Sequence, residues 1–307
     1  MSPQKKATAV SSSVAAVLTL LKLILGIASG SVAVLASAID SVLDMFVSIF
    51  NYFAISKSEK PADERFNYGR GKIEALASVI EGTIISISGL FLLYQAFLKA
   101  YTGETSSYLG ISILVMIISL SITILLVSYL NYIAKKTNSM VIKADALHYK
   151  TDVFSTLAVL ISLLLVYFTG YEIIDALIGA GIAIYIIFSA YRLIYDGIMV
   201  LLDRAVDEKL VQEIVTIIKE NKRIHSFHLL KTREAANQTF VEVHLVFDNL
   251  ISLVEAHKVS DSIESKIKKL DKKRDWNITI HLDPYDDLKI DKFITQLSHI
   301  KPSCFLV

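Results

Sequence analysis

Long apolar runs fill the first two thirds of this chain, and they constrain its fold more than any other feature. Six such segments extend approximately over 8–28, 32–55, 76–98, 109–133, 145–168 and 174–201. A hydrocarbon core about 30 Å thick requires roughly 20 helical residues to cross it, and lipid offers no hydrogen-bond partner to free backbone groups. The pattern therefore predicts six transmembrane helices within residues 1–203.

Basic residues gather at one set of helix ends. They are Lys5, Lys6, Lys57, Lys60, Arg65, Arg70, Lys72, Lys135, Lys136 and Lys143, and two charged connections, 56–72 and 135–143, join the helices there. The other ends have short turns marked by Gly30, Gly103 with Tyr108, and Gly170 with Tyr171, and a single basic residue, Lys99. The positive-inside rule places the basic ends in the cytoplasm. Both termini are then cytoplasmic, and the first run is interpreted as a retained helix rather than a signal peptide.

The last third of the chain has the pattern of a small cytoplasmic domain over 204–300, followed by a tail over 301–307. Apolar spacing predicts helices over 208–221 and 253–270. The stretch TFVEVHLVFD alternates strictly, and so does 277–283, where His281 and Asp283 point outward. The order helix, strand, strand, helix, strand predicts an α+β domain with helices on one face of a sheet. The fold class is a polytopic α-helical membrane protein with six transmembrane helices plus this C-terminal cytoplasmic α+β domain.

Composition excludes several functions. The formal net charge is only +1, so nothing suggests a nucleic-acid partner. Cys304 is the single cysteine, so the chain has neither a disulfide framework nor a thiolate metal cluster.

Two pairs of polar residues interrupt the apolar segments. Asp40 and Asp44 lie four residues apart in SAIDSVLDMF, and His148 and Asp152 have the same spacing in ALHYKTDVF. Residues i and i+4 share one face of a helix, and a charge inside the bilayer costs several kcal/mol. If the two faces meet, three carboxylates and an imidazole converge on a ligand set that suits Zn²⁺, with Fe²⁺, Cd²⁺ and Mn²⁺ as alternatives.

Other acidic residues in these segments carry less information. Asp145 and Asp175 stand near predicted helix ends, where an aspartate is usually interfacial, and we interpret them so. Glu81 lies deeper in the third segment and could face a partner helix or a water-filled path. Histidine titrates near neutral pH, and a metal must displace protons from its ligands. A site at His148 that alternates between metal and protons has the minimum requirement of an antiporter.

The motifs SAIDSVLDMF, KPADERFNYGRGKIEALA, ADALHYKTDVFS and LLDRAVDE resemble those of the cation diffusion facilitator family over essentially the whole chain. The resemblance is strongest to bacterial zinc and iron efflux members, whose C-terminal domains are metallochaperone-like. It implies a homodimer of the inner membrane that exchanges a divalent cation for protons by alternating access. It also implies a transport site at Asp40, Asp44, His148 and Asp152, in which the histidine favours zinc.

The same resemblance assigns further residues. It implies a cytoplasmic binuclear zinc site at His228, His244, His257, His281 and Asp283, whereas His225 and His299 have no matching role. Lys72 and Asp203 match a pair that joins the dimer near the membrane surface.

One loop departs from the family pattern. Asp63 matches a metal-binding aspartate, but Phe66 and Arg70 replace the histidines. A phenyl ring cannot ligate a metal and a guanidinium repels it, so this loop site is predicted to be absent or weakened. Asp63 and Glu64 are then expected to form a solvated, charged loop.

The resulting hypothesis is a proton-coupled divalent-cation exporter, not an enzyme, with Zn²⁺ as cargo and as regulatory or structural ion. The absence of a GxxxxGK[ST] loop argues against ATP use. Three rivals are an intramembrane metalloenzyme, for which HExxH is missing, a membrane metal sensor that signals through its tail, and a passive channel.

Overall fold

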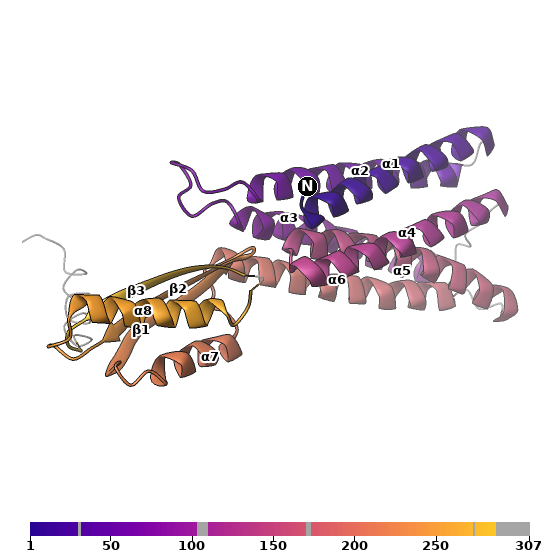
Figure 1. Ribbon diagram of the computed structural model, residues 1–307. Coiled ribbons are helices and arrows are strands. Elements are labelled where there is room, and N and C mark those ends of the chain that lie inside the picture. Colours follow the sequence, from indigo (N-terminus) through magenta and orange to yellow (C-terminus); the bar gives the residue numbers. More distant parts are fainter. Residues whose placement is uncertain (30–31, 103–109, 170–172, 273, 287–307) are drawn as a thin grey trace, which may run out of the picture. The chain divides into compact units, whose positions relative to one another are not determined.

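The computed structural model describes residues 1–29, 32–102, 110–169, 173–272 and 274–286 (Figure 1). The side chains of some residues inside helices also lie outside the described part, among them Asp40, Lys99 and Asp175. The predicted turns at Gly30, Gly103 with Tyr108, and Gly170 with Tyr171 lie outside it too, as do His299 and Cys304. The chain forms two compact units that divide between Leu202 and Asp203, and each is described by itself.

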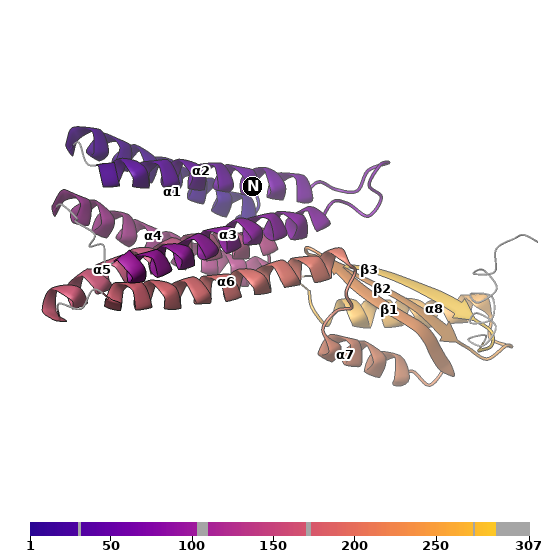
Figure 2. The same cartoon turned by 180° about the vertical axis from the view of Figure 1, so that it is seen from behind.

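The first unit consists of six long helices that run alternately up and down (Figures 1 and 2). They are α1 (Pro3–Ser29), α2 (Val32–Ser58), α3 (Lys72–Thr102), α4 (Gly110–Thr137), α5 (Met140–Thr169) and α6 (Ile173–Leu201). Within the described residues, four stretches are long and apolar enough to cross a membrane: Pro3–Leu25, Lys72–Leu98, Ile113–Thr137 and Ala176–Leu201. The six predicted helices are therefore present, whereas membrane crossing by α2 and α5 stays a prediction.

The helices extend beyond the predicted apolar segments at the ends rich in basic residues. Helix α5 begins at Met140 rather than at 145, and α4 ends at Thr137 rather than at 133. The predicted connection over 135–143 is wrong, because only Asn138 and Ser139 separate α4 from α5. Asn138 has a left-handed backbone with φ 56°, which ends α4. An apolar window detects only the part of a helix that lies in lipid, so it misses these polar turns.

Glycines allow α3 and α6 to pack closely along much of their length. A Cβ atom at Gly197 would lie 2.6 Å from Val79 and 3.1 Å from the backbone oxygen of Ala75. A side chain at that position would therefore push the two helices apart, so the glycine sets the distance between them.

The second unit combines two helices with a three-stranded sheet. Its elements are α7 (Glu208–Lys219), β1 (Ser226–Ala235), β2 (Gln238–Val246), α8 (Leu253–Lys268) and β3 (Asp275–Asp283). The predicted order of elements is therefore the observed one. Strand β2 is central, antiparallel to β1 and parallel to β3. Buried residues such as Ile214 of α7, Val243 of β2 and Ile263 of α8 form one hydrophobic core, and the remaining face of the sheet is free to carry polar groups.

Candidate metal sites

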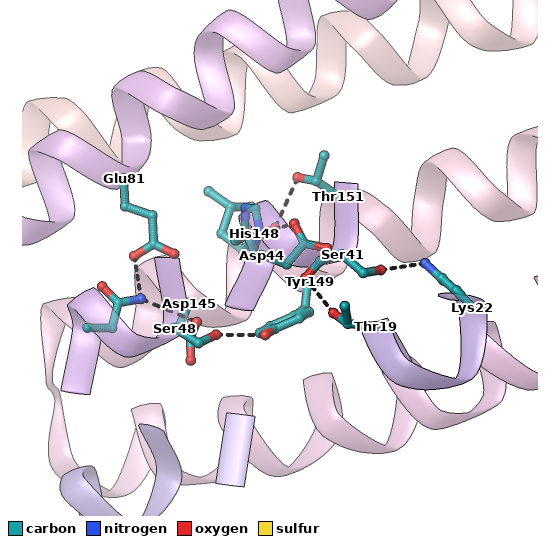
Figure 3. Close-up of polar contacts among 12 residues, drawn as sticks. Thr19, Lys22, Ser41, Asp44, Ser48, Glu81, Asp145, His148, Tyr149 and Thr151 are labelled. Atoms are coloured by element: carbon teal, nitrogen blue, oxygen red, sulfur yellow. Dashed lines mark hydrogen bonds and ion pairs between the residues drawn. The ribbon is translucent and has the colours of Figure 1, made fainter. Parts of the chain in front are cut away.

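Helices α2 and α5 bring three predicted ligands together, and Figure 3 shows two of them, Asp44 and His148, close to one another. His148 Nε2 lies 3.0 Å from Asp44 Oδ1, and ligand atoms of Asp44, His148 and Asp152 all lie within 4.8 Å of one another. The two side chains of the close pair are partly accessible, with 12% of His148 and 22% of Asp44 exposed. Asp40 stands one turn before Asp44 on α2, but its side chain is outside the described part. The arrangement offers carboxylate oxygens and an imidazole nitrogen to a cation of the zinc type.

A lysine that the apolar pattern did not single out contacts α2 near this cluster. Lys22 of α1 donates a hydrogen bond of 2.7 Å to Ser41 Oγ, and Thr19 donates one of 2.8 Å to the Ser41 backbone oxygen. Ser41 directly follows Asp40 in the sequence. The signal was available, because a lysine in the middle of an apolar segment is costly unless it has partners.

A second polar layer lies beside the cluster, toward the ends of α2 and α5 that carry Lys57 and Lys143. Tyr149 and Ser48 hydroxyls lie 2.7 Å apart. Asn51 Nδ2 donates to Glu81 Oε2 at 3.1 Å and to Asp145 Oδ1 at 3.3 Å (Figure 3). Glu81 therefore faces a partner helix, which was one of its two expected roles.

The interfacial interpretation of Asp145 is wrong. Its side chain is fully buried, because α5 begins five residues earlier than the apolar segment indicated. Asp145 also precedes His148 by three residues, a spacing that places both on the same side of the helix. That spacing was the missed signal.

In the second unit, strand register aligns three histidines in one row. His228 on β1 pairs with His244 on β2, which pairs with His281 on β3. Asp283 follows His281 by two residues on β3 and is buried at 5% exposure; the predicted outward position is therefore right for His281 and wrong for Asp283. Its Oδ2 is 3.2 Å from His228 Nε2 and 2.9 Å from His244 Nδ1, and its Oδ1 is 3.0 Å from His281 Nε2. Three imidazoles around one carboxylate fit the nitrogen and oxygen donors that zinc prefers.

His257 does not join this row within one chain. It lies on α8 with 69% of its side chain exposed, and its Nε2 is 3.7 Å from Asp261. His225 is exposed, as expected, and its backbone N–H donates to Val246.

The loop between α2 and α3 is held by residues at the altered family positions. The Arg70 guanidinium forms an ion pair with Asp63 and lies 4.2 Å from the centre of the Phe66 ring. Asp63 Oδ1 accepts hydrogen bonds from the backbone N–H groups of Arg65 and Phe66. The Arg70 hydrogen bond lowers the pKa of Asp63. The loop is exposed as predicted, but Asp63 already has a fixed cationic partner.

The predicted pair at the membrane surface has other contacts within each unit. Lys72 Nζ donates to the Leu201 backbone oxygen at 3.2 Å, and Asp203 Oδ1 lies 3.2 Å from Arg233. The pairing of Lys72 with Asp203 stays a prediction.

Apolar helices that gather carboxylates and an imidazole, joined to an α+β unit with a histidine–carboxylate row, define a membrane protein that handles metal ions. Residues 8–202 match the family model of the cation efflux transmembrane domain, and residues 206–285 match that of the cation efflux protein cytoplasmic domain. The chain belongs to the cation efflux family, which confirms the resemblance seen in its motifs.

Known relatives cover nearly the whole chain. The cation-efflux pump FieF of Yersinia enterocolitica is 36% identical over 280 residues, 91% of this chain and 92% of that protein. FieF of Serratia proteamaculans is 34% identical over 280 residues, with the same coverage. Among solved structures, the metal-bound C-terminal domain of the CzcD transporter from Thermotoga maritima is 22% identical and covers 25% of this chain and 87% of its own, with a TM-score of 0.23.

Proposed function

We propose that this protein exports a divalent metal cation, with Zn²⁺ as the favoured cargo, in exchange for protons. The convergence of Asp44, His148 and Asp152 from two helices of a cation efflux transmembrane domain carries the proposal. All six helices of the first unit would span the inner membrane, with both termini in the cytoplasm. Asp40 would complete the set of four ligands.

The ligand chemistry supports zinc among the alternatives. An imidazole suits zinc, whereas a set made only of carboxylates would suit Mn²⁺ better. Fe²⁺, Cd²⁺ and Mn²⁺ remain alternative cargoes of the same mechanism. Cation efflux is also what the names of the FieF relatives state for those proteins.

Protons enter the mechanism through the same side chains. His148 binds metal through a neutral nitrogen and Asp44 and Asp152 through ionised oxygens, so arrival of the ion requires these groups to lose protons. On the outer side, protons displace the ion and neutralise the negative charge of the carboxylates in the emptied site. Alternating access follows when α2 and α5 move with respect to the rest of the unit and expose the ligands to one side at a time.

The second unit would respond to metal and dimerise. His228, His244, His281 and Asp283 would hold zinc, and His257 would contribute a ligand where a second copy of the chain packs nearby. The match to the cytoplasmic domain model supports this role. Bound metal stabilises only the arrangement that presents its ligands, so the cytoplasmic metal level would alter dimer packing.

Proteoliposomes test the transport proposal directly. Zinc influx through inside-out protein should be accompanied by proton movement in the opposite direction, and His148→Ala and Asp152→Ala should abolish both. Asp196→Ala is a matched control, because Asp196 is an exposed carboxylate on α6. Zinc that moves without protons would refute antiport, and flux that persists in both ligand variants would refute the site.

A further inference from the structure

Two acidic side chains of the membrane unit share one hydrogen-bond donor, which leaves some of their oxygens without a hydrogen bond. Glu81 of α3 is 1% exposed, and Asp145 of α5 and Asn51 of α2 are 0% exposed. A single amide nitrogen, Asn51 Nδ2, donates to both carboxyl groups. Glu81 and Asp145, which are labelled in Figure 3, belong to different helices, α3 and α5. The three residues therefore form one buried contact between three helices.

Each of these residues also has one oxygen that lacks a partner. Among the described residues, Glu81 Oε1, Asp145 Oδ2 and Asn51 Oδ1 are buried and accept no hydrogen bond. Buried polar groups are normally hydrogen-bonded, and an unpaired buried charge is costlier still. Three unpaired acceptors in one contact are groups that a bound cation, or protons on the carboxyl groups, would satisfy.

The donor set defines the class of ligand. Rotation of the Asn51 amide by half a turn exchanges its nitrogen and oxygen, which differ little in shape. The amide oxygen would then face both carboxylates. Ser11 and Ser48 lie within hydrogen-bonding reach of Asp145, and a hydroxyl group that turns its hydrogen away can also present its oxygen to a cation. A set made of carboxylate, amide and hydroxyl oxygens suits a hard divalent cation such as Mn²⁺.

We propose that Glu81, Asp145 and Asn51 form a second cation site in the membrane unit, distinct from Asp44, His148 and Asp152. Asp145 precedes His148 by three residues and Asn51 follows Asp44 by seven, so the site lies about 5 to 10 Å along the helices from the first. A cation could bind at this site whether or not the protein transports it. If the proposed function holds, its place toward the basic helix ends makes it a relay for the ion between the cytoplasm and the transport site.

Glu74 provides a matched control on the same helix. It is also buried, at 4% exposure, but its two carboxylate oxygens contact the hydroxyls of Ser139 and Ser58. Glu74→Gln therefore makes the same chemical change at a buried glutamate that has its partners. Glu81→Gln and Asp145→Asn preserve shape and remove the negative charge.

The test measures Mn²⁺ bound to the detergent-solubilised full chain by electron paramagnetic resonance. Asp152→Ala and Asp283→Ala in the background weaken the two histidine-containing sites. The remaining Mn²⁺, about one ion per chain, should lack the coupling to imidazole nitrogen that either other site would produce. Addition of Glu81→Gln or Asp145→Asn should weaken its binding about 10-fold or more, whereas addition of Glu74→Gln should leave it unchanged.

Three outcomes would overturn the proposal: no nitrogen-free Mn²⁺ in the background protein, equal binding in the Glu81 and Glu74 variants, or proton release at Glu81 without bound Mn²⁺. The last would identify the carboxyl pair as a proton site instead. Elution of each variant as a monodisperse peak controls for folding. Because this measurement involves no gradient, its failure is separate from a failure of zinc-driven proton movement.

Discussion

The two histidine–carboxylate clusters of this protein use similar ligands on very different supports. In the membrane unit, Asp44 and His148 stand on separate helices, α2 and α5, and each helix forms its own backbone hydrogen-bond ladder. In the second unit, His228, His244 and His281 stand on neighbouring strands of one hydrogen-bonded sheet. The first pair can separate when the helices shift, whereas the row on the sheet keeps its spacing while the sheet is intact.

If the proposed function holds, the difference in support corresponds to a difference in task. A transported ion must be released, which requires ligands that move apart or become accessible to another side. A resident ion gains from ligands that are already in place, since preorganisation lowers the cost of binding. The partly exposed Asp44 and the buried Asp283, at 22% and 5% side-chain exposure, fit these roles. We therefore infer cargo at the helices and a stable ion at the sheet.

The largest expected effect is on zinc transport, which should depend on the membrane cluster and not on the histidine row of the second unit. Asp44→Ala removes a carboxylate from the membrane cluster and should reduce zinc flux in proteoliposomes about 100-fold or more, since even outer groups of metal sites contribute 10- to 100-fold. The same variant should retain zinc binding by the cytoplasmic row. Loss of binding at both clusters, measured by zinc stoichiometry in detergent, would contradict their independence.

The next effect concerns the stability of the second unit. Trp276 is the single tryptophan of the chain and packs in the core of that unit, so its fluorescence reports local unfolding in the full-length protein. Zinc at about 100 times its Kd should stabilise the unit by about 2.7 kcal/mol, and Asp283→Ala should abolish the shift. Asp44→Ala is the reciprocal control and should keep it. An unchanged shift in Asp283→Ala would place the ion elsewhere.

Sequence periodicity was sufficient for much of this comparison. Apolar length predicted the six helices, and the spacing of four residues predicted that Asp40 with Asp44, and His148 with Asp152, could form one site. Alternation at period two predicted that His281 and Asp283 share one face of β3, but the outward position was right only for His281, because Asp283 is buried at 5% exposure. These features depend on the periodicity of single helices and strands, which can be read from one sequence.

Other features depend on contacts between distant segments and could not be read from spacing. Alternation does not reveal strand register, so the row of His228, His244 and His281 needed the structure. Apolar length underestimates helix ends, which hid the depth of Asp145. The partner that Arg70 provides for Asp63 arises from the fold of a loop, where no periodic pattern exists.

A smaller effect tests whether helices α3 and α6 pack tightly against each other, in contrast to α2 and α5, which would move during transport. Gly197→Ala would place a Cβ atom 2.6 Å from Val79, and such overpacking costs about 1–3 kcal/mol. The thermal midpoint of the membrane unit in detergent should fall. Gly181→Ala is the matched control on the same helix, because its Cβ atom would meet nothing within 4 Å. Equal midpoints for the two variants would refute close α3–α6 packing, while Trp276 should report an unchanged second unit in both.

The smallest effect tests a third position, the loop where a guanidinium stands in place of metal-binding groups. Arg70 lowers the pKa of Asp63, so the folded loop binds a proton less readily than the unfolded chain. The ion pair therefore contributes its full stabilisation above the ordinary aspartate pKa of about 4, and the contribution is lost as pH falls through the lowered value. Hydrogen exchange of the Arg65 and Phe66 amides, corrected for intrinsic rates, should show protection that declines only in that acidic range.

Asp63→Asn should reduce protection of these amides at neutral pH and remove its pH dependence, whereas Glu64→Gln should do neither. If zinc increased the protection of these amides in the wild-type protein, the loop would still bind metal. The Arg70 guanidinium would then not take the place of a metal ion beside Asp63.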